Sequence, residues 1–287
     1  MPCPKSPSYA CDVLRCRTLL AGMYAHDTDH APLWYGDVFH MKHVHILLSG
    51  LLSLPLALQA AEIQVAVDPL MAAPIKNVGP LLQQRTGHTL KLTVEDSASL
   101  LPKLKSGTFD VWLGINAKQA EELEKDNLLE GKGRFVYAQG KLVLWSSNIS
   151  RVDAMGSVLE RAHIRRVAVV AADKDPHGEA TAKVLEALNL SERLAPKLLP
   201  VDTLALALEA ARTEQADLAF VTLAQVLHRG RVAAGSVWVV PPAHYPPIRY
   251  EGALLKSGTQ KEAAQALVQL LQSAEGQRRI NRFGFGP

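Results

Sequence analysis

The sequence contains very little cysteine, and what it has lies at one end. Only three of the 287 residues are cysteine, and Cys3, Cys11 and Cys16 all precede residue 17. The rest of the chain therefore has no structural disulfide, no thiolate metal site and no cysteine nucleophile. The spacing of the three does not match a zinc motif, so we do not expect the first residues to belong to the mature fold.

Motifs of catalysis and of nucleic-acid binding are also missing. The chain has no Gly-x-Ser-x-Gly elbow, no His-Glu-x-x-His pair and no phosphate-binding loop. Its formal net charge is +3, and no basic tract is present, so a nucleic-acid partner is not indicated. We therefore expect a protein that is not an enzyme, has no cofactor and has at most a weak preference for anionic partners.

An apolar run near the beginning of the chain is typical of an export signal. Residues 41–60 have a basic start at Lys42, an apolar stretch and small residues at the end. The stretch is too short, and too interrupted by proline and glycine, for a good membrane span. We predict a signal peptide at 41–60, cleaved near Ala60, and an upstream extension at 1–40 that is not part of the fold. A retained N-terminal anchor is the alternative; no cysteine follows the run, which argues against a lipoprotein.

The chain from residue 61 onward is predicted to begin with three strand–helix units. Apolar runs read as buried strands at 63–67, 90–94 and 110–115. Asp68-Pro69 opens the first helix and Ser97 lies at the start of the second. In an open parallel sheet, ligands bind beyond the carboxyl ends of the strands, where helix N-termini favour an anion.

A second block of strand–helix units follows. Strands are predicted at 166–171, 198–201 and 217–221, with Asp202-Thr203 capping a helix that runs through Arg212. Two extended segments separate the blocks. One is read as strands 135–138 and 141–145 joined by a hairpin-like connection at Gln139-Gly140, and the other spans 245–255.

These two blocks predict an α/β fold with two lobes and a central ligand cleft. We assign residues 61–137 and 247–287 to the first lobe and 138–246 to the second. The last helices, near 260–272 and 275–283, are expected to return to the first lobe.

Four stretches, considered in order, resemble one known family. They are 97–116, 167–182, 216–221 and 276–285, and together they are similar to the periplasmic molybdate-binding proteins of ABC importers, which have the type II periplasmic-binding-protein fold. The resemblance implies a monomeric periplasmic receptor that holds molybdate or tungstate through neutral hydrogen-bond donors. It also implies delivery to an ABC importer permease, without a resident metal or cofactor.

The resemblance also indicates five candidate ligand-binding residues. Ser97 matches the family's second-loop serine, and Pro69 stands where the first-loop serine would be. His177 lies in the Pro-x-Gly loop that offers a backbone N–H, Thr203 at a helix start, and Thr222 where the family has a tyrosine. Proline has neither N–H nor hydroxyl, so one donor pair is lost.

The departures from the family leave other interpretations open. Carboxylates near the predicted site, Asp68 and Asp96, would oppose an oxyanion, and an acidic lining would argue against this ligand. The alternatives are another small anion, an organic acid, or a metal cation held by Asp68, Asp96 and His177. Ser97 and Ser99 have helix capping as a simpler role. A secreted two-lobed enzyme using a pair among Asp68, Glu95 and Asp96, or the sensing domain of a regulator, is a further alternative.

Overall fold

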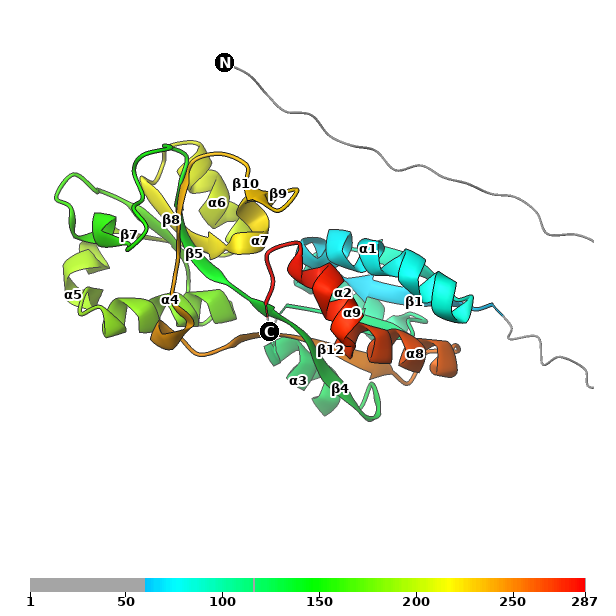
Figure 1. Cartoon of the computed structure of the whole chain (residues 1–287). Helices are drawn as coiled ribbons and strands as arrows, with labels where there is room; N and C mark the ends of the chain where they lie inside the picture. Colours follow the sequence, from blue (N-terminus) through cyan, green and yellow to red (C-terminus); the bar gives the residue numbers. More distant parts are fainter. Residues whose placement is uncertain (1–59, 116, 287) are drawn as a thin grey trace, which may run out of the picture. The chain divides into compact units, whose positions relative to one another are not determined.

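The computed structural model describes residues 60–115 and 117–286, which belong to one compact unit and form two five-stranded sheets (Figure 1). The predictions for 1–40 and 41–59 lie outside the described residues. The strand order is β2-β1-β3-β12-β4 in the first sheet and β11-β5-β8-β6-β7 in the second. This arrangement of two mixed sheets with helices confirms the predicted α/β class. No helix within the described ranges is long and apolar enough to cross a membrane.

The first sheet is built mainly from the first block of strand–helix units. β1 runs parallel to β2 and β3, whereas β12 is antiparallel to β3 and β4. Its strands are β1 Glu62–Val67, β2 Thr89–Val94, β3 Val111–Leu113, β4 Leu129–Gly140 and β12 Ile248–Leu255. Its helices are α1 Pro69–Thr86, α2 Ser97–Ser106, α3 Ala117–Lys125, α8 Lys261–Gln272 and α9 Ala274–Asn281.

The second sheet repeats the pattern. β6 is parallel to β7 and β8, and β5 is antiparallel to β8 and β11. Its strands are β5 Leu142–Ser146, β6 Val167–Val170, β7 Leu198–Val201, β8 Leu218–Thr222 and β11 Ser236–Val239. The helices are α4 Pro176–Ala187, α5 Ser191–Leu194, α6 Leu204–Arg212 and α7 Leu223–Val226, with 3₁₀ turns at Ser157–Glu160, Ala195–Lys197 and Pro242–His244. β9 Leu227–His228 and β10 Arg231–Val232 form a small separate hairpin.

The predicted hairpin at Gln139-Gly140 is wrong. β4 continues through Gly140 beside β12, and the chain then enters the other sheet as β5, where Leu142 pairs with Thr222 (Figure 1). A two-residue hairpin requires a positive φ, which Gly140 does not have. A Cβ on Gly140 would lie 2.9 Å from the Tyr250 hydroxyl and 3.0 Å from His177 Nε2. This glycine therefore permits close packing at the crossing between the sheets.

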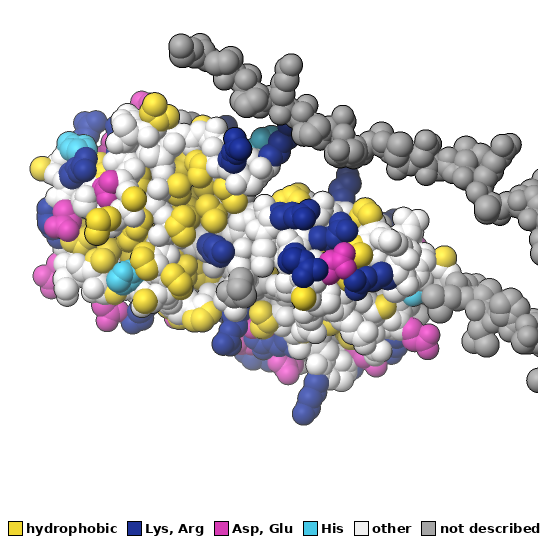
Figure 2. All heavy atoms as spheres, viewed as in Figure 1, with side chains coloured by type: hydrophobic (Ala, Val, Ile, Leu, Met, Phe, Trp, Pro, Cys, Tyr) yellow, Lys and Arg dark blue, Asp and Glu magenta, His cyan; other side chains and the backbone are white. Residues whose placement is uncertain are grey.

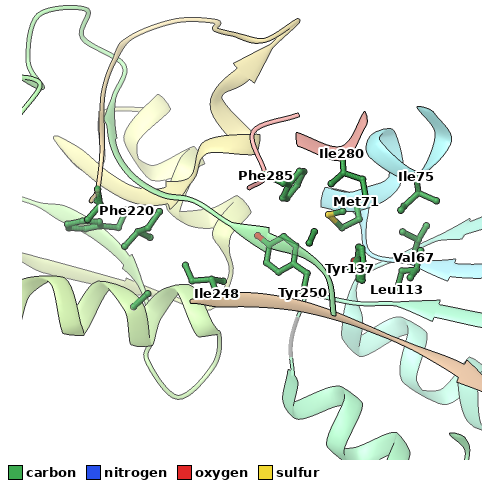
Figure 3. Packing of buried hydrophobic residues seen from close by; sticks show 14 of the residues in the cluster. Val67, Met71, Ile75, Leu113, Tyr137, Phe220, Ile248, Tyr250, Ile280 and Phe285 are labelled. Carbon is green, nitrogen blue, oxygen red and sulfur yellow. The ribbon is translucent and has the colours of Figure 1, made fainter. Parts of the chain in front are cut away.

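One apolar core runs through both sheets at this crossing. Figure 3 shows Phe220 of β8, Ile248 and Tyr250 of β12, and Phe285 near the C-terminus within one cluster. The rings of Tyr250 and Phe285 meet edge to face, with centroids 5.5 Å apart, which is a favoured aromatic geometry. The C-terminal segment thus packs onto β12 and the end of β4, beside the crossing between the two sheets.

The C-terminal helices pack against α1 and β4 of the first sheet. Arg279 Nη1 donates to the carbonyl of Asn77 in α1 at 3.2 Å, and Glu275 pairs with both Arg85 and Arg279. Figure 2 shows basic side chains gathered around an acidic one over α1 and α9. These pairs are partly exposed, so they contribute little stability, and the buried apolar face of α8 together with Ile280 of α9 provides most of the attachment.

Candidate functional site

Four helix N-termini converge on one cavity of about 770 Å³. The cavity lies between the beginnings of α1 and α2, which follow strands of the first sheet, and of α4 and α6, which follow strands of the second. Its walls comprise Asp68, Pro69, Leu70, Asp96, Ser97, Ala98, Ile115, Lys174, Asp175, Asp202, Thr203, Leu204, Ala205 and Gln225. Unpaired N–H groups and the positive ends of helix dipoles thus face one space, as an anion site requires.

Aspartate caps three of these four helices. Asp68 Oδ1 accepts from the Leu70 N–H at 2.9 Å in α1, and Asp175 Oδ1 accepts from the His177 N–H at 2.8 Å in α4. Asp96 Oδ1 accepts from the Ser99 N–H at 3.0 Å in α2. A carboxylate is a favoured N-cap because it satisfies a free N–H and complements the helix dipole. The price of these caps is negative charge placed at the cavity wall.

The second loop shows which of its serines has a structural role. Asp96 is the N-cap of α2, so the alternative in which Ser97 or Ser99 caps this helix is wrong. Ser99 instead hydrogen bonds Asp96 with both its N–H and its hydroxyl, the latter at 2.8 Å. Ser97 is the first helical residue and lines the cavity, and its hydroxyl has no partner among the described residues. Capping therefore leaves the Ser97 hydroxyl available for a ligand.

Asp68 is the most perturbed carboxyl group of the cavity. Its side chain is only 7% exposed, and burial raises its pKa from 3.8 to about 6. The Leu70 N–H works against this rise, the negative charges of Asp175 and Asp96 add to it, and His177 opposes it. No cation forms an ion pair with Asp68 within the described ranges. Asp68 is thus a buried acid without a direct counter-charge.

Asp175 occupies the matching position on the opposite wall but has a partner. His177 Nδ1 lies 2.7 Å from Asp175 Oδ1, and because a carboxylate only accepts, the imidazole is the donor. His177 Nε2 lies 3.0 Å from the Tyr250 hydroxyl on β12. Burial alone would raise the pKa of Asp175, but the hydrogen bonds and charge of His177 outweigh it, so the pKa falls below its usual value.

The five predicted ligand contacts divide into two groups. Ser97, Pro69 and Thr203 line the cavity. His177 and Thr222 are buried and are not among the lining residues. The N–H of His177 donates to Asp175 and that of Thr222 to Gln225 Oε1 at 3.2 Å, so both backbone donors already have partners.

Four further polar residues of the lining were not predicted as site residues. They are Lys174, Asp175, Asp202 and Gln225. Asp175 precedes Pro176 as Asp68 precedes Pro69, so the repeated Asp-Pro dipeptide was the signal that could have identified it. Lys174 Nζ lies 3.5 Å from Asp202 Oδ1, which joins the loops before α4 and α6. Nothing in the local sequence marks Gln225, whose amide is held by the Leu204 carbonyl at 2.9 Å.

The cavity wall is acidic, with four aspartates and one lysine. From the sequence, such a lining was expected to argue against an oxyanion, because carboxylates repel it. It does not form a metal site either, because no group of three His, Cys, Asp or Glu side chains in the described part of the chain could hold a metal ion. The proposed ligand His177 already uses both ring nitrogens, for Asp175 and Tyr250. Any ligand proposed for this cavity therefore has to be compatible with the four carboxylates on its wall.

The suggested acid–base pair is also not assembled across the cavity. Glu95 forms an ion pair with Lys103 on the exposed side of α2. Asp68 and Asp96 both follow strands of the first sheet and both serve as helix caps, so they do not face each other from opposite walls.

Comparison with known proteins identifies relatives over nearly the whole described chain. Residues 63–286 match the family of bacterial extracellular solute-binding proteins. The chain is 35% identical to the molybdate-binding protein ModA of Azotobacter vinelandii over 231 residues, which is 80% of this chain and 92% of that protein. It is 32% identical to ModA of Rhodobacter capsulatus over 239 residues, 83% of this chain and 93% of that protein.

A solved structure agrees with these sequence matches. The periplasmic molybdate-binding protein of Azotobacter vinelandii superposes with a TM-score of 0.67 and 25% identity, over 78% of this chain and 99% of that one. The shared fold is the predicted periplasmic-binding-protein type. The cavity described above lies between the two sheets of this fold.

Proposed function

The chain belongs to the bacterial extracellular solute-binding proteins, and from this premise we propose that it is a receptor for a small tetrahedral oxyanion, molybdate or tungstate. The receptor would act in the periplasm as a monomer, without a resident cofactor or catalytic role, and pass its ligand to the permease of an ABC importer. Residues 61–137 and 247–287 would form one lobe and 138–246 the other. The names of the two relatives support the ligand class.

The observation that carries this proposal is the convergence of four helix N-termini on one cavity. A buried dianion is stable only if its oxygens are hydrogen bonded. The first turns of α2 and α6 supply donors from both sheets, at Ser97 and Ala98 and at Leu204 and Ala205. The hydroxyls of Ser97 and Thr203 add to them. We propose Ser97 and Thr203 as direct contacts, Pro69 as part of the wall, and His177 and Thr222 as support behind it.

A ligand screen tests the proposal. The purified protein lacking residues 1–60 is mixed with molybdate, tungstate, sulfate or phosphate, and its unfolding temperature is measured. At a concentration about 100 times Kd, a ligand that binds only the folded state stabilises it by about 2.7 kcal/mol, which corresponds to about 5–10 °C. Molybdate or tungstate should give the largest shift. No shift with any oxyanion would contradict the proposal.

The second candidate is a receptor for a divalent metal cation. The carboxylates of the lining favour it, but no three His, Cys, Asp or Glu side chains among the described residues are grouped to hold a metal ion, so it is the weaker candidate. Asp68, Asp96, Asp175 and Asp202 are all on the cavity wall. Carboxylate oxygens are the usual ligands of hard cations. Adding divalent cations to the same screen separates the two candidates, because a cation receptor is stabilised by the metal and not by molybdate.

A further inference from the structure

The four aspartates of the cavity wall differ in what their oxygens already bind. Asp96 uses both oxygens for Ser99, and Asp175 Oδ1 is held twice by His177. Asp202 is 75% exposed and pairs with Lys174. Asp68 uses Oδ1 for the Leu70 N–H, and Oδ2 has no hydrogen bond from the described residues. Asp175 Oδ2 also has no hydrogen bond from these residues, but its carboxylate is paired with His177. Asp68 is therefore the buried aspartate of the cavity wall that has both a free oxygen and no ion-pair partner among the described residues.

An oxyanion beside this oxygen needs a proton between them. Two anionic oxygens in contact repel each other strongly in a site that excludes water. A proton on Oδ2 would remove that repulsion and convert an acceptor into an O–H donor directed at the ligand. The cap on α1 would persist, because Oδ1 remains an acceptor for Leu70.

We propose that Asp68 is a specificity residue which takes up one proton when the oxyanion binds, and which donates that proton as a hydrogen bond from Oδ2 to a ligand oxygen. The proposal rests on the proposed function. The proton comes from solvent, no covalent bond other than O–H changes, and the complex contains one anion and one added proton. Release of the anion returns the proton.

The charged and titratable groups around Asp68 favour the uptake of a proton by its carboxylate. From α2 it faces Asp96, and from the segment leading into α4 it faces Asp175 and His177. Tyr137 of β4 and Tyr250 of β12 are fully buried nearby and interact electrostatically with it. The Lys174–Asp202 pair lies on the opposite cavity wall, before α4 and α6. Asp96 and Asp175 raise the pKa of Asp68, only His177 acts in the opposite direction among these side-chain charges, and a bound dianion would add to the rise.

Linkage gives the expected pH dependence. Without a ligand, burial raises the pKa of Asp68 to about 6, and the charge of a bound anion raises it further. Between these two values each rise of about one pH unit weakens binding about tenfold, because the proton must be taken from more dilute solution. Affinity for molybdate should therefore be highest near the lower value and fall toward alkaline pH.

The experiment is calorimetric titration of the protein with molybdate from about pH 6 to about pH 8.5, in pairs of buffers with different ionisation enthalpies. The wild type should take up close to one proton per anion above the lower pKa, and its Kd should rise about tenfold per pH unit. In Asp68→Asn the amide can cap the helix and donate an N–H hydrogen bond to the ligand without taking up a proton from solvent. This variant should bind molybdate with little proton uptake and with a Kd that does not change with pH. Asp202→Asn removes one exposed charge from the opposite wall of the cavity and should keep the wild-type slope.

Three outcomes would overturn the inference. Tight molybdate binding with constant Kd and no proton uptake leaves the proposed function intact but shows that Asp68 carries no proton. A slope retained in Asp68→Asn assigns the proton to another group. An absence of binding at every pH contradicts the proposed function itself, and the inference with it. If Asp68→Asn does not fold, proton uptake by the wild type still decides.

Discussion

The two Asp-Pro dipeptides on opposite walls of the cavity have the same local structure and opposite electrostatics. Asp68 and Asp175 each cap a helix whose first residue is proline. Burial raises the pKa of Asp68 to about 6, whereas the contacts of His177 lower the pKa of Asp175 despite its burial. One partner side chain accounts for this difference. The carboxylate of Asp175 is thus paired with a neighbouring imidazole, whereas that of Asp68 forms no ion pair with any described residue.

The largest expected effect on stability comes from removing His177, the partner of Asp175. In His177→Ala the carboxylate of Asp175 loses its hydrogen-bonded partner, and Tyr250 loses its contact with Nε2. Removing one member of a buried pair costs about 3–5 kcal/mol, and the free energy of unfolding should fall by an amount in this range. Denaturant unfolding at neutral pH measures it. His163→Ala, at an exposed histidine, is the control, and equal stability of the two variants would refute the partnership.

The unpartnered wall should respond in the opposite sense. Asp68→Asn keeps the cap and removes a buried charge, so the empty protein should become more stable by about 2–3 kcal/mol at pH near 8. Because the folded pKa is raised, Asp68 binds a proton more tightly in the folded state than in the unfolded state. Its stabilising contribution is complete below about pH 4 and is lost as the pH rises through about 6. The gain from the variant should therefore vanish on acidification.

Asp175→Asn is the matched comparison for Asp68→Asn. The depressed pKa of Asp175 means that its ionised form stabilises the fold above the unfolded pKa, and that this stabilisation is lost as the pH falls through the folded value. Asparagine should therefore destabilise the protein at neutral pH. Denaturant unfolding at several pH values measures both variants, and changes of the same sign would mean that the walls do not differ.

The fold followed from the sequence more completely than the site did. Apolar runs marked β1, β6 and β8 because buried parallel strands have few polar positions. Gly140 was misread because glycine permits both tight turns and close packing, and only the contacts with Tyr250 and His177 show which applies. The Asp-Pro dipeptide marks Asp175 as a helix cap, whereas its place on the cavity wall opposite Asp68 depends on residues distant in the sequence. Tertiary proximity, unlike helix capping, leaves no local pattern.

The second loop offers the smallest and most specific test, because its two serines have different partners. Ser97→Ala removes the hydroxyl of a residue that lines the cavity. Molybdate affinity should fall about tenfold, because losing one hydrogen bond to a charged group weakens binding by about 1.4 kcal/mol. Stability of the empty protein should barely change. Ser99→Ala removes only a hydrogen bond to the exposed Asp96 carboxylate, and should lower stability only slightly, without altering affinity. Calorimetric titration and denaturant unfolding of both variants separate the roles. An unchanged affinity in Ser97→Ala would mean that the ligand is held by backbone N–H groups alone on this wall.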